Sequence, residues 1–322
     1  MTNNNEEAAP KKTSPKKDKP AAETEKKFEL SELIDVMFSS LSSDPPAGSE
    51  KRRNELISEY LKQQFINNPI ASSYNILILH DENRMVKSDA DNIYSAAGTF
   101  TDNLPLLLVL YSSGGLIASA YLIGKLCRQY CNGKFVVVVP RQAKSAATLL
   151  CCAADEIHMG SLSELGPIDP QIDNLPALGL KASVEHIADL IKTHPHASDM
   201  FAKYLNMSLQ LIHLGYYERV AESASQYAER LLNLHESNLI QKPSQIARDL
   251  VYSYKDHGFV IDKSDATEIF GQNVIKTDSE EYQLGNSIYA ALKYIARIAD
   301  IMGHNFYFIG SCDSQPNFAK RS

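Results

Sequence analysis

The middle of the chain alternates short apolar runs with longer segments in which apolar residues recur every three or four positions. Three apolar runs have the length and composition of buried strands: 74–80, 104–113 and 134–140. Helical patterns follow the first two runs, and a helix of small residues followed by a short strand comes after the third. Strands and helices that alternate at this spacing predict crossover units in a mostly parallel sheet. The pattern therefore indicates an α/β fold.

The segments on either side of this core have different patterns. Residues 1–27 are rich in Lys, Pro, Glu and Ala with almost no large apolar side chains, which predicts a disordered tail. Two amphipathic helices, at 28–41 and 50–66, predict an N-terminal helical arm over 28–70. Residues 71–322 then form the main domain. A helical insertion is predicted at about 182–234, from three helical patterns at 182–192, 198–214 and 216–234.

Composition argues for a globular protein and against several other classes. With 322 residues, 44% of them apolar, the chain is long enough for a real core, and a net charge of −7 argues against a nucleic-acid-binding surface. No apolar run approaches the ~20 residues that span a bilayer, and the N-terminus lacks the apolar core of a signal peptide, so a cytoplasmic location is expected. The five cysteines form no CxxC pair and have no matching Cys/His pair, which predicts reduced thiols and no metal site.

Two short motifs stand directly after strands, at Gly114-Gly115 and at Ser145. In a parallel sheet both would meet at the edge where the strands carry their carboxyl ends, which is where such folds place their chemistry. A nucleophilic serine needs a base and oxyanion donors beside it. From the residues alone, Ser145 could equally be a helix N-cap, and the two glycines could mark only a tight turn.

A resemblance extends this interpretation. The segment SSGGLIASAYLIGKL, followed by VPRQAKSAATLLCCAADEIHMG and SELGPIDPQ, is similar to the serine dehydrogenase proteinase family of Clp-fold serine peptidases, relatives of ClpP and signal peptide peptidase A. The likeness covers roughly residues 74–275. It implies a Clp/crotonase-like spiral β-sheet with crossover helices, and a serine peptidase that forms an acyl-enzyme and needs no cofactor.

The resemblance also implies roles for individual residues. Ser145 matches the family nucleophile, Asp169 the acidic residue and His257 the histidine, in the chain order Ser, Asp, His. Gly114 and Gly115 match the Gly-Gly oxyanion element, with the amide of Ala146 as the second donor. The expected partners are a peptide or protein substrate and further copies of the chain in a homo-oligomer, which could assemble through the 182–234 helices.

Three alternatives remain open. Signal peptide peptidases of this fold use a lysine base, and Lys181 is the candidate for a Ser145/Lys181 dyad. The chain could instead be a scaffold or binding protein that has the fold without turnover. A crotonase-like acyl-CoA enzyme is the third, although crotonases need no nucleophilic serine at the position of Ser145, and fold alone does not decide function.

Overall fold

The computed structural model describes residues 1–2, 28–172, 175–208 and 211–321. Most of the predicted disordered tail, 3–27, lies outside the described residues. At the centre is a sheet with the order β11-β10-β1-β2-β3-β5-β9. Its parallel strands are β1 (Asn75–Asp81), β2 (Leu106–Ser112), β3 (Phe135–Val139), β5 (Glu156–Met159) and β9 (Ile275–Thr277). The predicted α/β class with a mostly parallel sheet is therefore confirmed.

Side chains of the central strands alternate between two cores. On β1 and β2, Leu77 and Leu108 belong to one cluster, whereas Ile78 and Val109 belong to the other, as the two-residue period of a strand requires. Both faces are apolar because helices cover both, which explains the uninterrupted apolar runs in the sequence.

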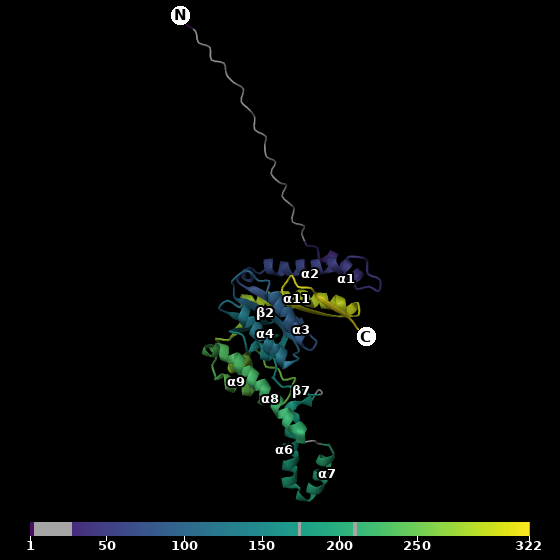
Figure 1. The fold of residues 1–322 in the computed structure, drawn as a ribbon, viewed down its shortest axis with the longest axis vertical. Coiled ribbons are helices and arrows are strands. Elements are labelled where there is room, and N and C mark those ends of the chain that lie inside the picture. The colour runs from purple at the N-terminus through teal and green to yellow at the C-terminus, as the bar shows by residue number, and fades with distance from the viewer. Residues whose placement is uncertain (3–27, 173–174, 209–210, 322) are drawn as a thin grey trace.

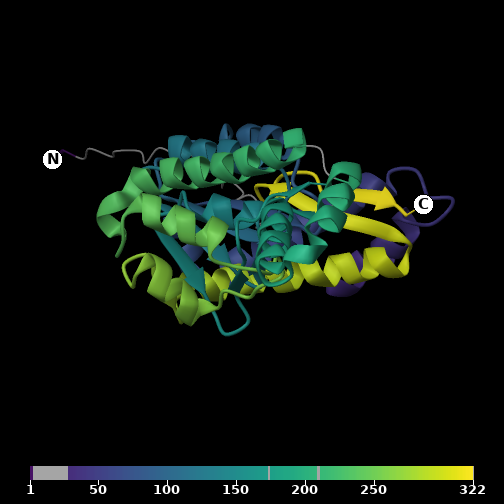
Figure 2. The same cartoon turned by 90° about the horizontal axis from the view of Figure 1, so that it is seen from below.

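The two faces carry different sets of helices (Figures 1 and 2). One face packs against α3 (Lys87–Ala97), α4 (Ile117–Tyr130), α5 (Ala146–Cys151), α8 (Leu211–Leu232), α9 (Pro243–Tyr252) and α10 (Lys263–Phe270). The other packs against α1 (Leu30–Ser40), α2 (Ser49–Ile66) and α11 (Glu280–Ile301). The predicted N-terminal helices are thus present, and they lie against the sheet together with α11.

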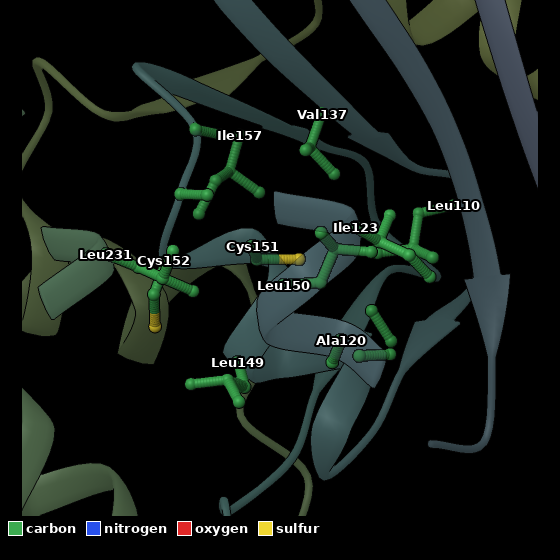
Figure 3. Packing of buried hydrophobic residues seen from close by; sticks show 14 of the residues in the cluster. Leu110, Ala120, Ile123, Val137, Leu149, Leu150, Cys151, Cys152, Ile157 and Leu231 are labelled. Carbon is green, nitrogen blue, oxygen red and sulfur yellow. The ribbon is translucent and has the colours of Figure 1, made fainter. Parts of the chain in front are cut away.

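The helix α5 is the centre of the larger core (Figure 3). All six of its residues are fully buried, between the sheet and α4. Gly124 of α4 permits this close packing, because a Cβ there would lie 3.0 Å from the Cβ of Ala153. A fully buried helix is a rigid support for the residue that precedes it, Ser145.

The sequence pattern failed at two places. Two C-terminal strands were not predicted: β10 (His304–Gly310), which pairs antiparallel with β1, and β11 (Asn317–Lys320), which pairs with β10. The partner of β10, β1, is more than 220 residues away, so no local pattern identifies the place of β10 in the sheet. The predicted break at 214–216 is also wrong, because α8 runs through Gly215 without interruption.

Two further helices, α6 (Ala177–Thr193) and α7 (Ser198–Ser208), extend away from the sheet with the adjoining part of α8 (Figure 1). They occupy the region of the predicted helical insertion. Apolar side chains on α7 are exposed: Met200, Tyr204 and Met207. No helix in the described ranges combines the length and the apolar character that crossing a bilayer requires.

Candidate active site

Ser145 sits in a backbone conformation that serine rarely adopts. Its φ is 52° and its ψ is −116°, at the point where the chain leaves β4 (Gln142–Ala143) and enters α5. Ser145 occupies the N-cap position of α5, but its hydroxyl makes no capping hydrogen bond, so the interpretation as a simple cap is wrong. Such a conformation costs about 1–3 kcal/mol. A strained serine at a strand-to-helix turn, with its hydroxyl not used as a cap, is the arrangement of a nucleophile elbow.

Gly114 lies directly against this turn, and Gly115 lies against the backbone of Met85. A Cβ placed on Gly114 would lie 2.9 Å from the Cβ of Ser145 and 3.2 Å from the amide nitrogen of Ala146. A Cβ on Gly115 would overlap the backbone of Met85. Both glycines have positive φ, 103° and 151°. Gly114 therefore does more than mark a tight turn, because only glycine lets the backbone approach the serine so closely.

Two amides beside Ser145 are free to bind an anion. Gly115 pairs with Met85 as an isolated parallel bridge, whose hydrogen bonds use Gly114 O and the Leu116 amide. The N–H of Gly115 therefore has no partner among the described residues, and the same holds for Ala146 at the start of α5. The N–H of Gly114 is already used, since it donates to Ser112 Oγ at 3.1 Å. Of the three expected oxyanion donors, Gly115 and Ala146 are thus the available ones.

Asp169 and His257 meet although 88 positions separate them in the chain. His257 Nδ1 lies 3.4 Å from Asp169 Oδ2. The carboxylate is the more buried partner: the Asp169 side chain is 11% exposed and the His257 side chain 29%. Neither His257 Nδ1 nor Asp169 Oδ1 has a well-aligned hydrogen bond among the described residues, as is common in catalytic pairs without substrate.

The environment of Asp169 changes its ionisation. Burial raises the pKa of its carboxyl, and the neighbouring His257 opposes this rise. The carboxyl is therefore held in a desolvated position where its charge is stabilised by the imidazole. An acidic residue that orients a histidine base needs this combination.

Backbone hydrogen bonds join the segment that carries Asp169 to the segment that carries His257. Leu165 and Ile261 exchange two N–H···O bonds of 2.9 and 3.1 Å. The N–H of Ile168 donates to Leu250 O at 2.8 Å. These three bonds frame both members of the pair, so the contact between Asp169 and His257 follows from the course of the main chain.

Lys144, directly before Ser145, reaches both segments. Its Nζ donates to Leu165 O at 3.1 Å and to Phe259 O at 3.3 Å, and it lies 3.3 Å from a carboxylate oxygen of Glu164. The turn that presents Ser145 is thereby joined to the segments of Asp169 and His257. Residue patterns did not identify the two hydrogen bonds, because their acceptors are main-chain oxygens.

The structure gives no support for a base or a metal site at the other candidate residues among those it describes. Lys181 lies in α6, but its side chain is outside the described residues. His158 is buried on β5, with its two ring nitrogens 2.6 Å from Ser279 Oγ and 3.1 Å from Glu156 Oε2, which indicates a structural role. No cluster of three or more His, Cys, Asp or Glu side chains suited to a metal occurs in the described part of the chain.

Comparison with known proteins supports the resemblance. Two uncharacterized proteins of Methanocaldococcus jannaschii, MJ0137 and MJ1495, are 34% identical over 97 residues and 32% identical over 92 residues. These matches cover 30% and 29% of this chain, and 34% and 31% of the respective relatives, so the similarity spans about a third of their length. Residues 62–200 match the ClpP-like SDH-type serine proteinase family. This segment, which holds Ser145 and Asp169, is therefore similar to the family that the motifs of the chain resemble.

Proposed function

We propose that this protein is a serine endopeptidase that hydrolyses peptide bonds through an acyl-enzyme on Ser145. The observation that carries the proposal is the backbone of Ser145, which is held at φ 52° without a capping hydrogen bond. Strain of this kind persists only where the surrounding structure imposes it, and here it presents a hydroxyl group beside two free amides. The family match over residues 62–200 supports the same reaction class.

His257 is the proposed general base and Asp169 its orienter. The Nδ1 atom of His257 faces the carboxylate, which leaves Nε2 to take the proton from Ser145 and return it to the leaving amine. The buried carboxylate of Asp169 stabilises the imidazolium that forms in between. This pair completes a triad in the chain order Ser, Asp, His.

The amides of Gly115 and Ala146 are the proposed oxyanion hole. As the serine oxygen attacks a carbonyl, negative charge develops on the carbonyl oxygen, and fixed N–H donors stabilise that charge without reorganisation. Removing one donor of this type from an oxyanion hole costs about 10²–10³ in kcat. The contact of Gly114 with Ser145 sets the spacing between these amides and the nucleophile.

The wider features of the proposal follow from the family. The sheet would have the spiral course of Clp-like folds, and substrate would bind as an added extended strand, which recognises backbone with little dependence on sequence. We propose a cytoplasmic homo-oligomer that assembles through the projecting helices. Met200 and Met207, which are 61% and 87% exposed, support a contact on α7.

A fluorophosphonate probe tests the proposal, because it reacts only with an activated serine. The wild-type protein is expected to be labelled at Ser145, whereas Ser145→Ala is not labelled. Ser161→Ala is the matched control, since Ser161 is an exposed serine in the loop after β5 and should leave labelling unchanged. Equal labelling of wild type and Ser145→Ala would refute the nucleophile.

The same assay separates the triad from its alternatives. With a His257 base, His257→Ala is expected to lower the labelling rate at least 10³-fold while Lys181→Ala retains it. The reverse result would establish the Ser145/Lys181 dyad. A folded wild-type protein that is not labelled at all would favour the scaffold.

A further inference from the structure

The ammonium group of Lys144 makes two hydrogen bonds and one ion pair, with three different oxygens. They are the main-chain oxygens of Leu165 and Phe259 and the carboxylate of Glu164, at 3.1, 3.3 and 3.3 Å. The side chain is only 14% exposed, so these contacts are partly shielded from water. Two hydrogen bonds and an ion pair in this setting hold the ammonium group in place.

Its path requires a gap in the neighbouring segment. A Cβ on Gly166 would lie 2.7 Å from Lys144 Cδ, so glycine at this position makes room for the lysine. The amide of Lys144 is itself anchored, because it donates to Ser112 O at 3.0 Å at the end of β2. The lysine therefore connects a fixed strand end to two loops.

The segment 254–260, which carries His257, depends on this lysine. Within the segment, the amides of Gly258 and Phe259 bond back to Asp256, and the ring of Phe259 packs on Tyr254 at 4.9 Å. Among the described residues, the bond from Lys144 Nζ to Phe259 O is the only hydrogen bond that links 254–260 to the rest of the protein. Without it, the loop would be held by local contacts, by the packing of Tyr254 against the larger core and by the looser contact of His257 with Asp169.

We propose that Lys144 is a positioning residue, which ties the loop of the proposed base His257 and the segment of Asp169 to the turn of the proposed nucleophile Ser145. This role rests on the proposed serine peptidase function. Because Lys144 acts through Phe259 O and Leu165 O, it sets the distance between base and nucleophile without touching substrate. It is distinct from the lysine base of a dyad, since its ammonium group is held by two main-chain oxygens and the carboxylate of Glu164.

The test compares Lys144→Met with wild type in the rate of fluorophosphonate labelling, resolved into the maximal rate kinact and the probe affinity KI. Methionine keeps the unbranched apolar stem beside Gly166 and removes the ammonium group. A misplaced base slows the chemical step, so kinact is expected to fall about 10- to 100-fold while KI stays within about threefold. Amide hydrogen exchange is expected to accelerate in 254–260 and not in the sheet.

The matched control is Lys255→Met. Lys255 is exposed, lies two residues from His257 and carries the same charge, but has no hydrogen bond or ion pair among the described residues. Its kinact should equal that of wild type. If kinact falls by the same factor in both variants, the effect comes from the lost positive charge and not from the hydrogen bonds of Lys144. This result would overturn the proposal.

Each remaining outcome also tests the positioning role of Lys144 or the proposed function. Unchanged kinact in a folded Lys144→Met protein, or an effect confined to KI, refutes the positioning role and leaves the serine peptidase proposal intact. If Lys144→Met does not fold, Glu164→Gln replaces it, with an expected three- to tenfold fall in kinact; no fall would refute the role. If wild type is not labelled at Ser145, the proposed function fails, whereas the exchange of 254–260 still shows whether Lys144 tethers the loop.

Discussion

Gly114 offers the sharpest test of how the glycine loop supports Ser145. Two costs would accompany Gly114→Ala. The first is the positive φ of 103°, which costs a residue with a Cβ about 1–2 kcal/mol. The second is overlap, because the new Cβ would lie 2.7 Å from Lys144 O and 2.9 Å from the Cβ of Ser145, and forcing atoms into a packed site costs about 1–3 kcal/mol. Together they predict a loss of about 2–5 kcal/mol in unfolding free energy.

Gly133 provides the control for the first cost alone. Its φ is 78°, but a Cβ there would meet nothing within 4 Å. Gly133→Ala is therefore expected to lower the unfolding free energy by about 1–2 kcal/mol, measured by urea denaturation, and to leave fluorophosphonate labelling at the wild-type rate. The difference between the two variants isolates the contact with the Ser145 turn.

Labelling then reports what the overlap does to the site. If the backbone yields to relieve the overlap in Gly114→Ala, Ser145 and the amides of Gly115 and Ala146 move apart, and a displacement of about 1 Å costs on the order of 10²-fold in rate. The expected result is thus a folded, less stable protein with at least 10²-fold slower labelling. Wild-type labelling in Gly114→Ala, with stability equal to that of Gly133→Ala, would refute the reasoning.

Two further predictions concern ionisation and an ion pair. Since burial raises the pKa of Asp169 in the folded protein, the folded state holds that proton more tightly and wild-type stability falls as pH rises from about 4. Asp169→Asn removes this dependence. As the pH rises from about 4, the unfolding free energy of the variant, measured by urea titration, should therefore increase relative to that of wild type. A relative decrease would contradict the raised pKa of Asp169. Arg128 makes two bonds to Asp155, of 2.6 and 3.0 Å, with both side chains about 15% exposed, and Arg128→Met should cost about 2–4 kcal/mol of unfolding free energy. Lys192→Met, which breaks an exposed pair with Asp189, should cause no measurable change in the same assay, and equal effects would show that burial is not what matters.

The central sheet could be predicted because its information is local. Strands buried on both faces must be apolar throughout, so the runs ending at His80, Ser113 and Pro140 were recognisable without any partner. The strands β10 and β11 could not be found in this way. The place of β10 beside β1 is decided by pairing across the whole chain, and β11 joins the sheet only through β10.

The site divides in the same way. The sequence by itself determined that Gly114-Gly115 and Ser145 follow directly after strands, and its motifs matched Asp169 and His257 to a family, because chain order and residue type suffice for both. Only the tertiary structure decided that Ser145 is strained and uncapped and that Lys144 reaches Phe259 O. It also decided that, within the part of the chain that is described, the amide of Gly115 has no partner whereas that of Gly114 has one. These properties depend on backbone angles and on main-chain atoms from distant segments, which no pattern of side chains encodes.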